Sequence, residues 1–129
     1  MSSLSAVAPQ HDSLTPFGQA DANLTLGGFS LNQISNMLGK NVFYAYDRQV
    51  IQRQVDIFRA AVPARIKLHY AIKANPYWPV VQHMRPLVDG FDVASQKEML
   101  LALQSGMPVQ DISFAGPGKT DAELTAAIT

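Results

Sequence analysis

Short apolar runs recur along this chain, and each is followed by a stretch with helical spacing. The runs cover residues 41–46, 65–73, 90–95 and 111–116. Their first residues lie roughly 20 to 25 positions apart, as in repeating strand–helix units. Strands joined by helical crossovers form right-handed βαβ units. The pattern therefore predicts an α/β fold with a parallel sheet.

The segments between the runs carry helix end signals. Residues 47–62 begin at a good N-cap, Asp47, and predict a helix with one apolar stripe formed by Ile51, Val55, Phe58 and Val62. Ser95 predicts a second N-cap, and Glu98 stands three positions later as in a capping box. Pro79 and Pro86 restrict the segment between them to a short helix.

The alternation within the runs helps to choose between a doubly wound sheet and a barrel. Central strands of a doubly wound sheet are apolar on both faces. Here one face of residues 65–73 carries Ile66, Leu68, Tyr70 and Ile72, and the other carries Lys67, His69, Ala71 and Lys73. In residues 90–95, Asp92 and Ala94 likewise oppose Phe91 and Val93. This favours a barrel with a polar interior, in which Lys73 and Asp92 lie near the carboxyl-terminal rim.

Residues 41–129 are therefore interpreted as the first four βα units of a partial (β/α)8 TIM barrel. A closed barrel has eight such units, so we expect the chain to be the front part of a larger protein. Residues 1–14 are expected to be a mobile polar leader. Residues 15–40 predict a strand, a turn at Gly27 and Gly28, and a short helix that ends near Gly39.

Composition excludes several classes of function. Ten basic and ten acidic residues give no net charge, and the lysines are scattered, so nucleic acid is not an expected partner. The absence of cysteine excludes disulfides and thiolate metal sites, and fits the cytoplasm. His11 and His83 have no partners at metal-ligand spacing. No apolar run approaches the roughly 20 residues of a membrane span, so no membrane partner is expected.

Lys73 ends an apolar run and is the sharpest candidate for chemistry. A lysine desolvated at a strand end can be a neutral amine nucleophile that forms a Schiff base. It can equally be a surface lysine whose ammonium group reaches water past the strand. Spacing alone leaves both interpretations open.

Three segments carry a family resemblance: "YAIKANP" around Lys73, "GFDVASQKE" from residue 90, and "ISFAGPGKTDAEL" from residue 112. In this order and spacing they resemble the signatures of the fold-type III pyridoxal phosphate decarboxylases, which include diaminopimelate, ornithine and arginine decarboxylases on an alanine racemase-like barrel. With "LTLGGFSL" and "FYAYDR", the chain is most similar to the exosortase-system-associated branch of this family. The resemblance runs from about residue 15 to residue 129.

The resemblance implies an enzyme that decarboxylates a basic or diamino amino acid with pyridoxal 5'-phosphate and releases carbon dioxide. It implies that Lys73 holds the cofactor as a Schiff base, that Ala71 lines the pocket, and that Asp92 and Glu98 belong to the site. From the residues alone, Asp92 could instead be a strand-end turn former, and Glu98 only a capping partner of Ser95. His69 is interpreted as a hydrogen-bonded core histidine.

"GKT" at residues 118–120 imitates the end of a nucleotide-binding P-loop. The full motif needs a glycine five residues earlier, and that position is Ser113. We therefore expect Lys119 and its neighbouring glycines to shape a strand-to-helix turn.

By the resemblance, the groups that bind the phosphate and the pyridine nitrogen lie beyond residue 129, as do residues of a second subunit and a C-terminal β domain that residues 15–40 would join. A homodimer with shared sites is implied, and the 129 residues alone are expected to hold cofactor poorly and to be inactive. The alternatives are an alanine racemase-like enzyme and a non-catalytic cofactor-binding barrel.

Overall fold

The structure is a computed structural model that describes residues 18–20 and 23–129. The expected leader, residues 1–14, and His11 within it lie outside the described residues. Contacts divide the chain into two compact units, Met1–Ile51 and Gln52–Thr129.

In the first unit three antiparallel strands precede a helix. They are β1 (Gly18–Ala20), β2 (Asn23–Leu26), β3 (Phe29–Ser30) and α1 (Leu31–Leu38). The predicted turn is confirmed, since Gly27 and Gly28 join β2 to β3 with φ of 57° and 84°. The predicted helix is also confirmed, and it ends at Gly39, where φ is 61°. Only one strand was predicted before the turn, so β1 and the short β3 were not predicted.

The prediction of a strand at residues 41–46 is wrong. These residues form no ladder, and the side chains of Val42 and Tyr44 are 89% and 92% exposed. Apolar alternation makes a segment able to form a strand, but a strand also needs a neighbour for its backbone groups. No described segment pairs with this one. The predicted N-cap that follows is confirmed, because Asp47 Oδ1 accepts hydrogen bonds from the N–H groups of Gln49 (2.8 Å) and Val50 (3.3 Å).

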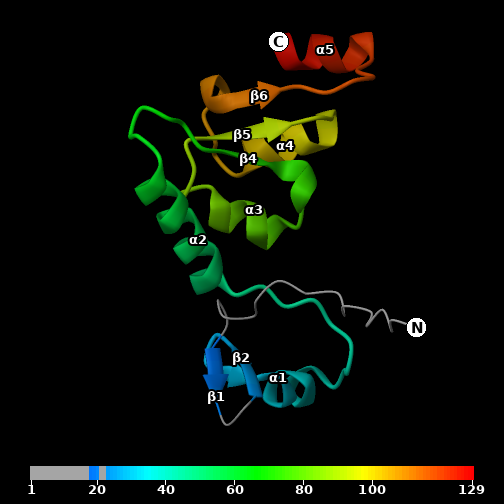
Figure 1. Cartoon of the computed structure of the whole chain (residues 1–129). Coiled ribbons are helices and arrows are strands. Elements are labelled where there is room, and N and C mark those ends of the chain that lie inside the picture. The colour runs from blue at the N-terminus through cyan, green and yellow to red at the C-terminus, as the bar shows by residue number, and fades with distance from the viewer. Residues whose placement is uncertain (1–17, 21–22) are drawn as a thin grey trace, which may run out of the picture. The chain divides into compact units, whose positions relative to one another are not determined.

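The second unit contains the predicted parallel sheet. Its strands are β4 (His69–Ala71), β5 (Gly90–Val93) and β6 (Ile112–Phe114), with β5 in the middle (Figure 1). Four βα units were predicted, and the described residues form three parallel strands. Strand β4 is also shorter than residues 65–73. Residues 65–68 precede it without joining the ladder, and at its carboxyl end the chain turns into a 3-10 helix, η1 (Ile72–Ala74).

Helices accompany these strands at nearly the predicted positions. They are α2 (Arg48–Ala61), α3 (Trp78–Met84), α4 (Gln96–Gln104), a 3-10 turn η2 (Val109–Asp111), and α5 (Asp121–Ile128). Helix α4 packs against β5 and β6, and α3 packs against α4. The largest fully buried side chains form the core between these elements: Phe91, Ile72, Val81 and Val93. Burying this apolar surface is the main stabilising contribution in the unit.

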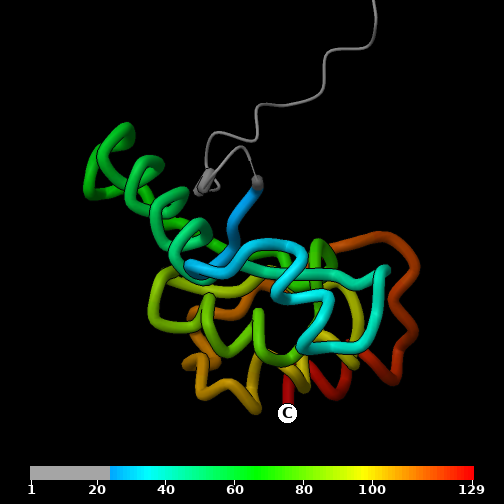
Figure 2. Tube along the Cα trace, turned by 90° about the horizontal axis from the view of Figure 1, so that it is seen from below, coloured from blue at the N-terminus to red at the C-terminus, as the bar shows by residue number. Residues whose placement is uncertain are grey.

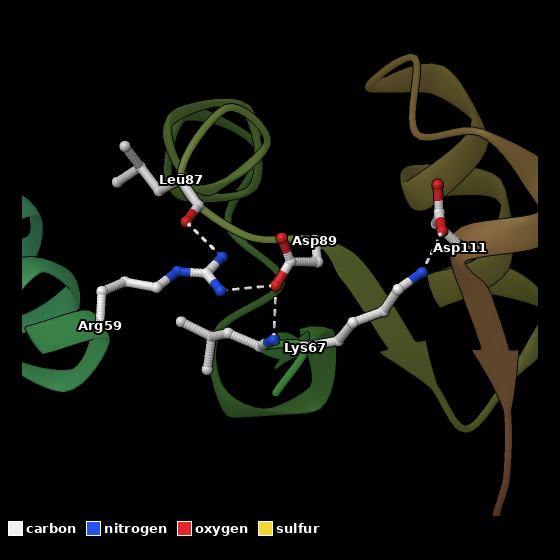
Figure 3. A network of polar contacts seen from close by, with 6 residues as sticks. Arg59, Lys67, Leu87, Asp89 and Asp111 are labelled. Atoms are coloured by element: carbon white, nitrogen blue, oxygen red, sulfur yellow. Dashed lines mark hydrogen bonds and ion pairs between the residues drawn. The ribbon is translucent and has the colours of Figure 1, made fainter. Parts of the chain in front are cut away.

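Helix α2 projects from the sheet, as its green coil shows in Figures 1 and 2. Of the predicted apolar stripe Val55 is buried, whereas Phe58 is 41% exposed. Polar contacts at the amino ends of β4 and β5 attach α2 to the sheet (Figure 3). Arg59 Nη1 lies 2.6 Å from Asp89 Oδ2, and that oxygen also accepts a 2.7 Å hydrogen bond from the N–H of Leu68. These bonds hold the pKa of Asp89 below its usual value.

Candidate functional site

The two faces of the parallel sheet differ in chemistry, as the alternation predicts. Tyr70, Phe91 and Ile112 are partners across the three strands, and Phe91 is fully buried beneath the helices. One position further along, Ala71, Asp92 and Ser113 are partners. Because partners in a parallel ladder point to the same side, these three form a row on the opposite face. The row ends at the carboxyl edge of the sheet, where α/β proteins place ligand sites.

The turn after β4 presents Lys73 at this edge. Ile72 is fully buried and anchors the turn, and its carbonyl accepts a 3.1 Å hydrogen bond from the N–H of Asn75. From the buried side, the Tyr70 hydroxyl donates to the carbonyl oxygen of Asn75 at 3.0 Å. Asn75 Oδ1 accepts from the N–H of Tyr77 at 3.1 Å, which fixes the end of the loop. A rigid turn therefore holds the backbone of Lys73 in place.

The same turn brings Lys73 toward the other predicted site residues. It packs against β5, which carries Asp92, and against α4, which carries Glu98. Ala71 stands directly beside Asp92 in the ladder. The four predicted site residues are therefore gathered at one edge of one sheet.

The described residues do not bury Lys73. Its side chain is exposed, and no ion pair joins it to Asp92 in the described part of the chain. The physical reason is the open sheet, since three strands are too few to curl round and shield the face that carries Ala71, Asp92 and Ser113. The described residues alone do not desolvate Lys73, so its interpretation as a desolvated amine stays a prediction.

Asp92 is held by a residue that the sequence reasoning did not include in the site. Ser113 Oγ donates a 2.9 Å hydrogen bond to Asp92 Oδ1, and it lies 3.4 Å from the carbonyl oxygen of Phe91. The signal was present, because Ser113 stands between the apolar Ile112 and Phe114 in the run 111–116 and therefore points to the opposite, polar face. What the sequence could not give was the register that puts Ser113 beside Asp92.

Glu98 supports the loop between β5 and α4. Ser95 caps α4 as predicted and accepts a 3.3 Å hydrogen bond from the N–H of Glu98. The reciprocal bond of a capping box is shifted by one residue, because Glu98 Oε2 accepts from the N–H of Ala94 at 2.9 Å and not from Ser95. This contact explains Glu98 as a structural residue next to the site, and its direct role stays a prediction.

His69 lies on the polar face one step before Ala71 and is half-buried. Its ring covers Gly90, its partner in β5, where an added Cβ would come within 2.5 Å of His69 Cε1 and would also collide with the carbonyl oxygen of Asp111. Only glycine leaves room for this approach.

The turn after β6 is shaped as predicted. Gly116 and Gly118 adopt φ of 131° and 79°, which side chains disfavour. Lys119 Nζ donates to the carbonyl oxygen of Gly116 at 2.9 Å and lies 5.2 Å from the ring centroid of Phe114. Lys119 therefore stabilises its own loop, and the prediction of a strand-to-helix turn is confirmed.

Carboxylates of the chain itself occupy the amino end of α4. Besides the Glu98 contact, Glu123 Oε1 accepts a 3.5 Å hydrogen bond from the N–H of Gln96. The other oxygen, Oε2, accepts from the N–H of Thr120 at 2.9 Å, and bonds to Thr120 keep the pKa of Glu123 lowered.

Across residues 18–20 and 23–129, no group of three acidic or histidine side chains is arranged to hold a metal. None of the helices described is long and apolar enough to cross a membrane.

These features define an α/β domain with a lysine, an aspartate and a small residue at the carboxyl edge of a parallel sheet. Residues 48–129 match the family model described as the pyridoxal binding domain of pyridoxal-dependent decarboxylases. The match covers more than half of the chain, so the chain belongs to this family. The expected cofactor, pyridoxal phosphate, is thereby confirmed at the level of the family.

Individual relatives agree with this assignment. Diaminopimelate decarboxylase of Aquifex aeolicus is 34% identical over 84% of this chain, which covers 25% of that protein. A 2-[(L-alanin-3-ylcarbamoyl)methyl]-2-hydroxybutanedioate decarboxylase of Staphylococcus aureus is 35% identical over 67% of the chain, which covers 21% of the relative. The chain thus spans about a quarter of the length of the curated relatives that it matches.

Solved structures show the same fold. A crystal structure of AQ1208 from Aquifex aeolicus has a TM-score of 0.78 and 33% identity over 89% of this chain, which covers 28% of that structure. A crystal structure of a diaminopimelate decarboxylase from M. jannaschi has a TM-score of 0.72 and 21% identity. The match covers 88% of this chain and 27% of that structure. The second likeness shows the fold alone.

Proposed function

We propose that these residues are the amino-terminal part of a pyridoxal phosphate-dependent amino-acid decarboxylase whose cofactor is attached to Lys73. One observation carries the proposal. A chain of this family presents the amine of Lys73 on a turn fixed by Ile72 and Tyr70, at the edge where Ala71 and Asp92 are adjacent. A primary amine at this place can condense with an aldehyde once the rest of the protein shields it from water.

The described residues fit one part of the cofactor and not another. One carboxylate oxygen of Asp92 has no hydrogen-bond partner among the described residues, and the neighbouring Ala71 has a small side chain that leaves space. The amino end of α4, by contrast, is already occupied by Glu98 and Glu123 and offers no free phosphate cradle. In the proposal, residues after 129 bind the phosphate.

Each residue has a distinct role. Lys73 would hold the cofactor through Nζ and would accept or return a proton at that atom, while Asp92 would orient cationic nitrogen atoms by charge. Ala71 leaves room for the ring, and Glu98 holds the loop that follows Asp92 through the N–H of Ala94. The bound cofactor supplies the electron sink for loss of the carboxylate. Glu98 thus contributes to cofactor binding indirectly.

The proposed substrate is a basic or diamino amino acid. The Aquifex relative and similar proteins of Campylobacter jejuni and Vibrio cholerae are diaminopimelate decarboxylases, which supports the diamino class. We further propose a cytoplasmic homodimer, in which the uncovered polar face is completed by the rest of the protein. Membership of the exosortase-associated branch also stays a prediction.

The proposal is tested by carbon dioxide release from the full-length protein with diaminopimelate, lysine, ornithine and arginine. Lys73→Ala should lower the rate by about 10² to 10⁴-fold or more. Lys97→Ala is the matched control, since Lys97 is an exposed lysine on α4. Racemised amino acid without carbon dioxide would support the alanine racemase-like alternative, and bound cofactor without either product would support a non-catalytic barrel.

A further inference from the structure

We infer that Ser113 is a positioning residue for Asp92, so that the site contains a serine–aspartate pair on neighbouring strands. The inference rests on the proposed function, because it concerns the carboxylate assigned to the cofactor site. It goes beyond that function by giving a role to Ser113.

The parallel register creates the pair. Asp92 stands in the middle strand, between Ala71 on β4 and Ser113 on β6. Adjacent strands lie about 4.8 Å apart, so side chains in one row reach each other across the ladder. Ala71 has no polar group to offer, and Ser113 has one. Among the described residues, the carboxylate is therefore tethered from the β6 side alone.

The hydrogen bond selects one orientation of the carboxylate. Ser113 Oγ donates to Asp92 Oδ1 at 2.9 Å, within the usual range for a hydroxyl bonded to an ionised oxygen. Its contact with the Phe91 carbonyl oxygen is longer, at 3.4 Å, so Asp92 is the better acceptor for the single hydroxyl hydrogen. With Oδ1 engaged, Oδ2 is left for a cation at the same edge. Without Ser113, the Asp92 side chain could rotate between staggered conformers.

The test compares Ser113→Ala, which removes the hydroxyl, with Ser113→Thr, which keeps it on a residue suited to strands. Pyridoxal 5'-phosphate is added to the full-length apoprotein, and the rate constant of Schiff-base formation at Lys73 is followed by absorbance, independently of turnover. A hydrogen bond to a charged group predicts a roughly tenfold slower reaction for Ser113→Ala and a rate within about twofold of wild type for Ser113→Thr. Ser105→Ala is the matched control, because Ser105 donates a 2.6 Å hydrogen bond to a backbone carbonyl away from the pair.

A double-mutant cycle shows whether Ser113 acts through Asp92. In an Asp92→Asn background, Ser113→Ala should change the rate by less than about twofold. Equal rates for wild type and Ser113→Ala, or independent effects of the two substitutions, would overturn the inference. If the wild-type protein still labels Lys73 and releases carbon dioxide in that case, the proposed function is unaffected. A wild-type protein that does neither overturns the proposed function and this inference together.

Discussion

The ion pair between Arg59 and Asp89 should contribute measurably to stability, and Asp89→Ala is the change that tests it. Asp89 Oδ2 accepts from Arg59 Nη1 at 2.6 Å and from the Leu68 N–H at 2.7 Å (Figure 3). Hydrogen bonds to charged groups contribute about 1.5–3 kcal/mol each. The two charged side chains are 33% and 35% exposed, so water reduces each contribution to about 1 kcal/mol. The substitution should lower the free energy of unfolding by about 2 kcal/mol.

Urea unfolding of the full-length protein at pH 7 measures this loss. Lys67→Met is the matched control, because Lys67 pairs with Asp111 at 3.5 Å while its side chain is 68% exposed. That change should cost less than about 0.5 kcal/mol. The reasoning is refuted if Asp89→Ala has the same free energy of unfolding as the wild type. It is also refuted if Asp89→Ala and Lys67→Met lower this free energy by the same amount.

The pH dependence of the same pair has a definite sign. The hydrogen bonds from Arg59 and Leu68 lower the pKa of Asp89 from its usual 3.8. The charged carboxylate therefore stabilises the fold above pH 3.8, and this contribution is lost as the pH falls through the lower pKa of the folded state. The stability difference between wild type and Asp89→Asn should shrink over that acid range.

Three further changes follow from other contacts. Gly90→Ala should lower the free energy of unfolding in urea by about 1–3 kcal/mol, because the added Cβ collides with the backbone of Asp111. An unchanged midpoint of urea unfolding would contradict this. Tyr70→Phe removes the hydrogen bond to the Asn75 carbonyl, so it should lower the free energy of unfolding by about 1 kcal/mol and speed hydrogen exchange in the turn that bears Lys73. Unaltered exchange in this turn would refute the prediction. Glu123→Gln should remove a stabilising contribution that is present above pH 4.5 and lost as the pH falls through the lowered pKa. Unfolding from pH 7 to pH 3 measures it, and identical pH profiles would disprove it.

Local signals predicted most of the elements. Asp47 and Ser95 both cap helices as predicted, because a side-chain oxygen satisfies free N–H groups whatever the distant surroundings are. Alternation likewise separated buried Phe91 from Asp92, since side chains on a strand point to opposite faces.

Features that depend on partners were harder to predict. Residues 41–46 have the pattern of a strand but no neighbour to pair with. The burial of Lys73 depends on what covers the polar face, and the described residues leave that face open. The bond from Ser113 to Asp92 depends on strand register, which no short segment encodes.

The most direct test of the account locates the cofactor. The full-length protein is incubated with pyridoxal 5'-phosphate, reduced with borohydride, digested, and its labelled peptide identified by mass spectrometry. We predict one label for each chain, on Lys73, and its loss in Lys73→Arg but not in Lys97→Arg. Label on a different lysine, or none at all, would contradict the central claim.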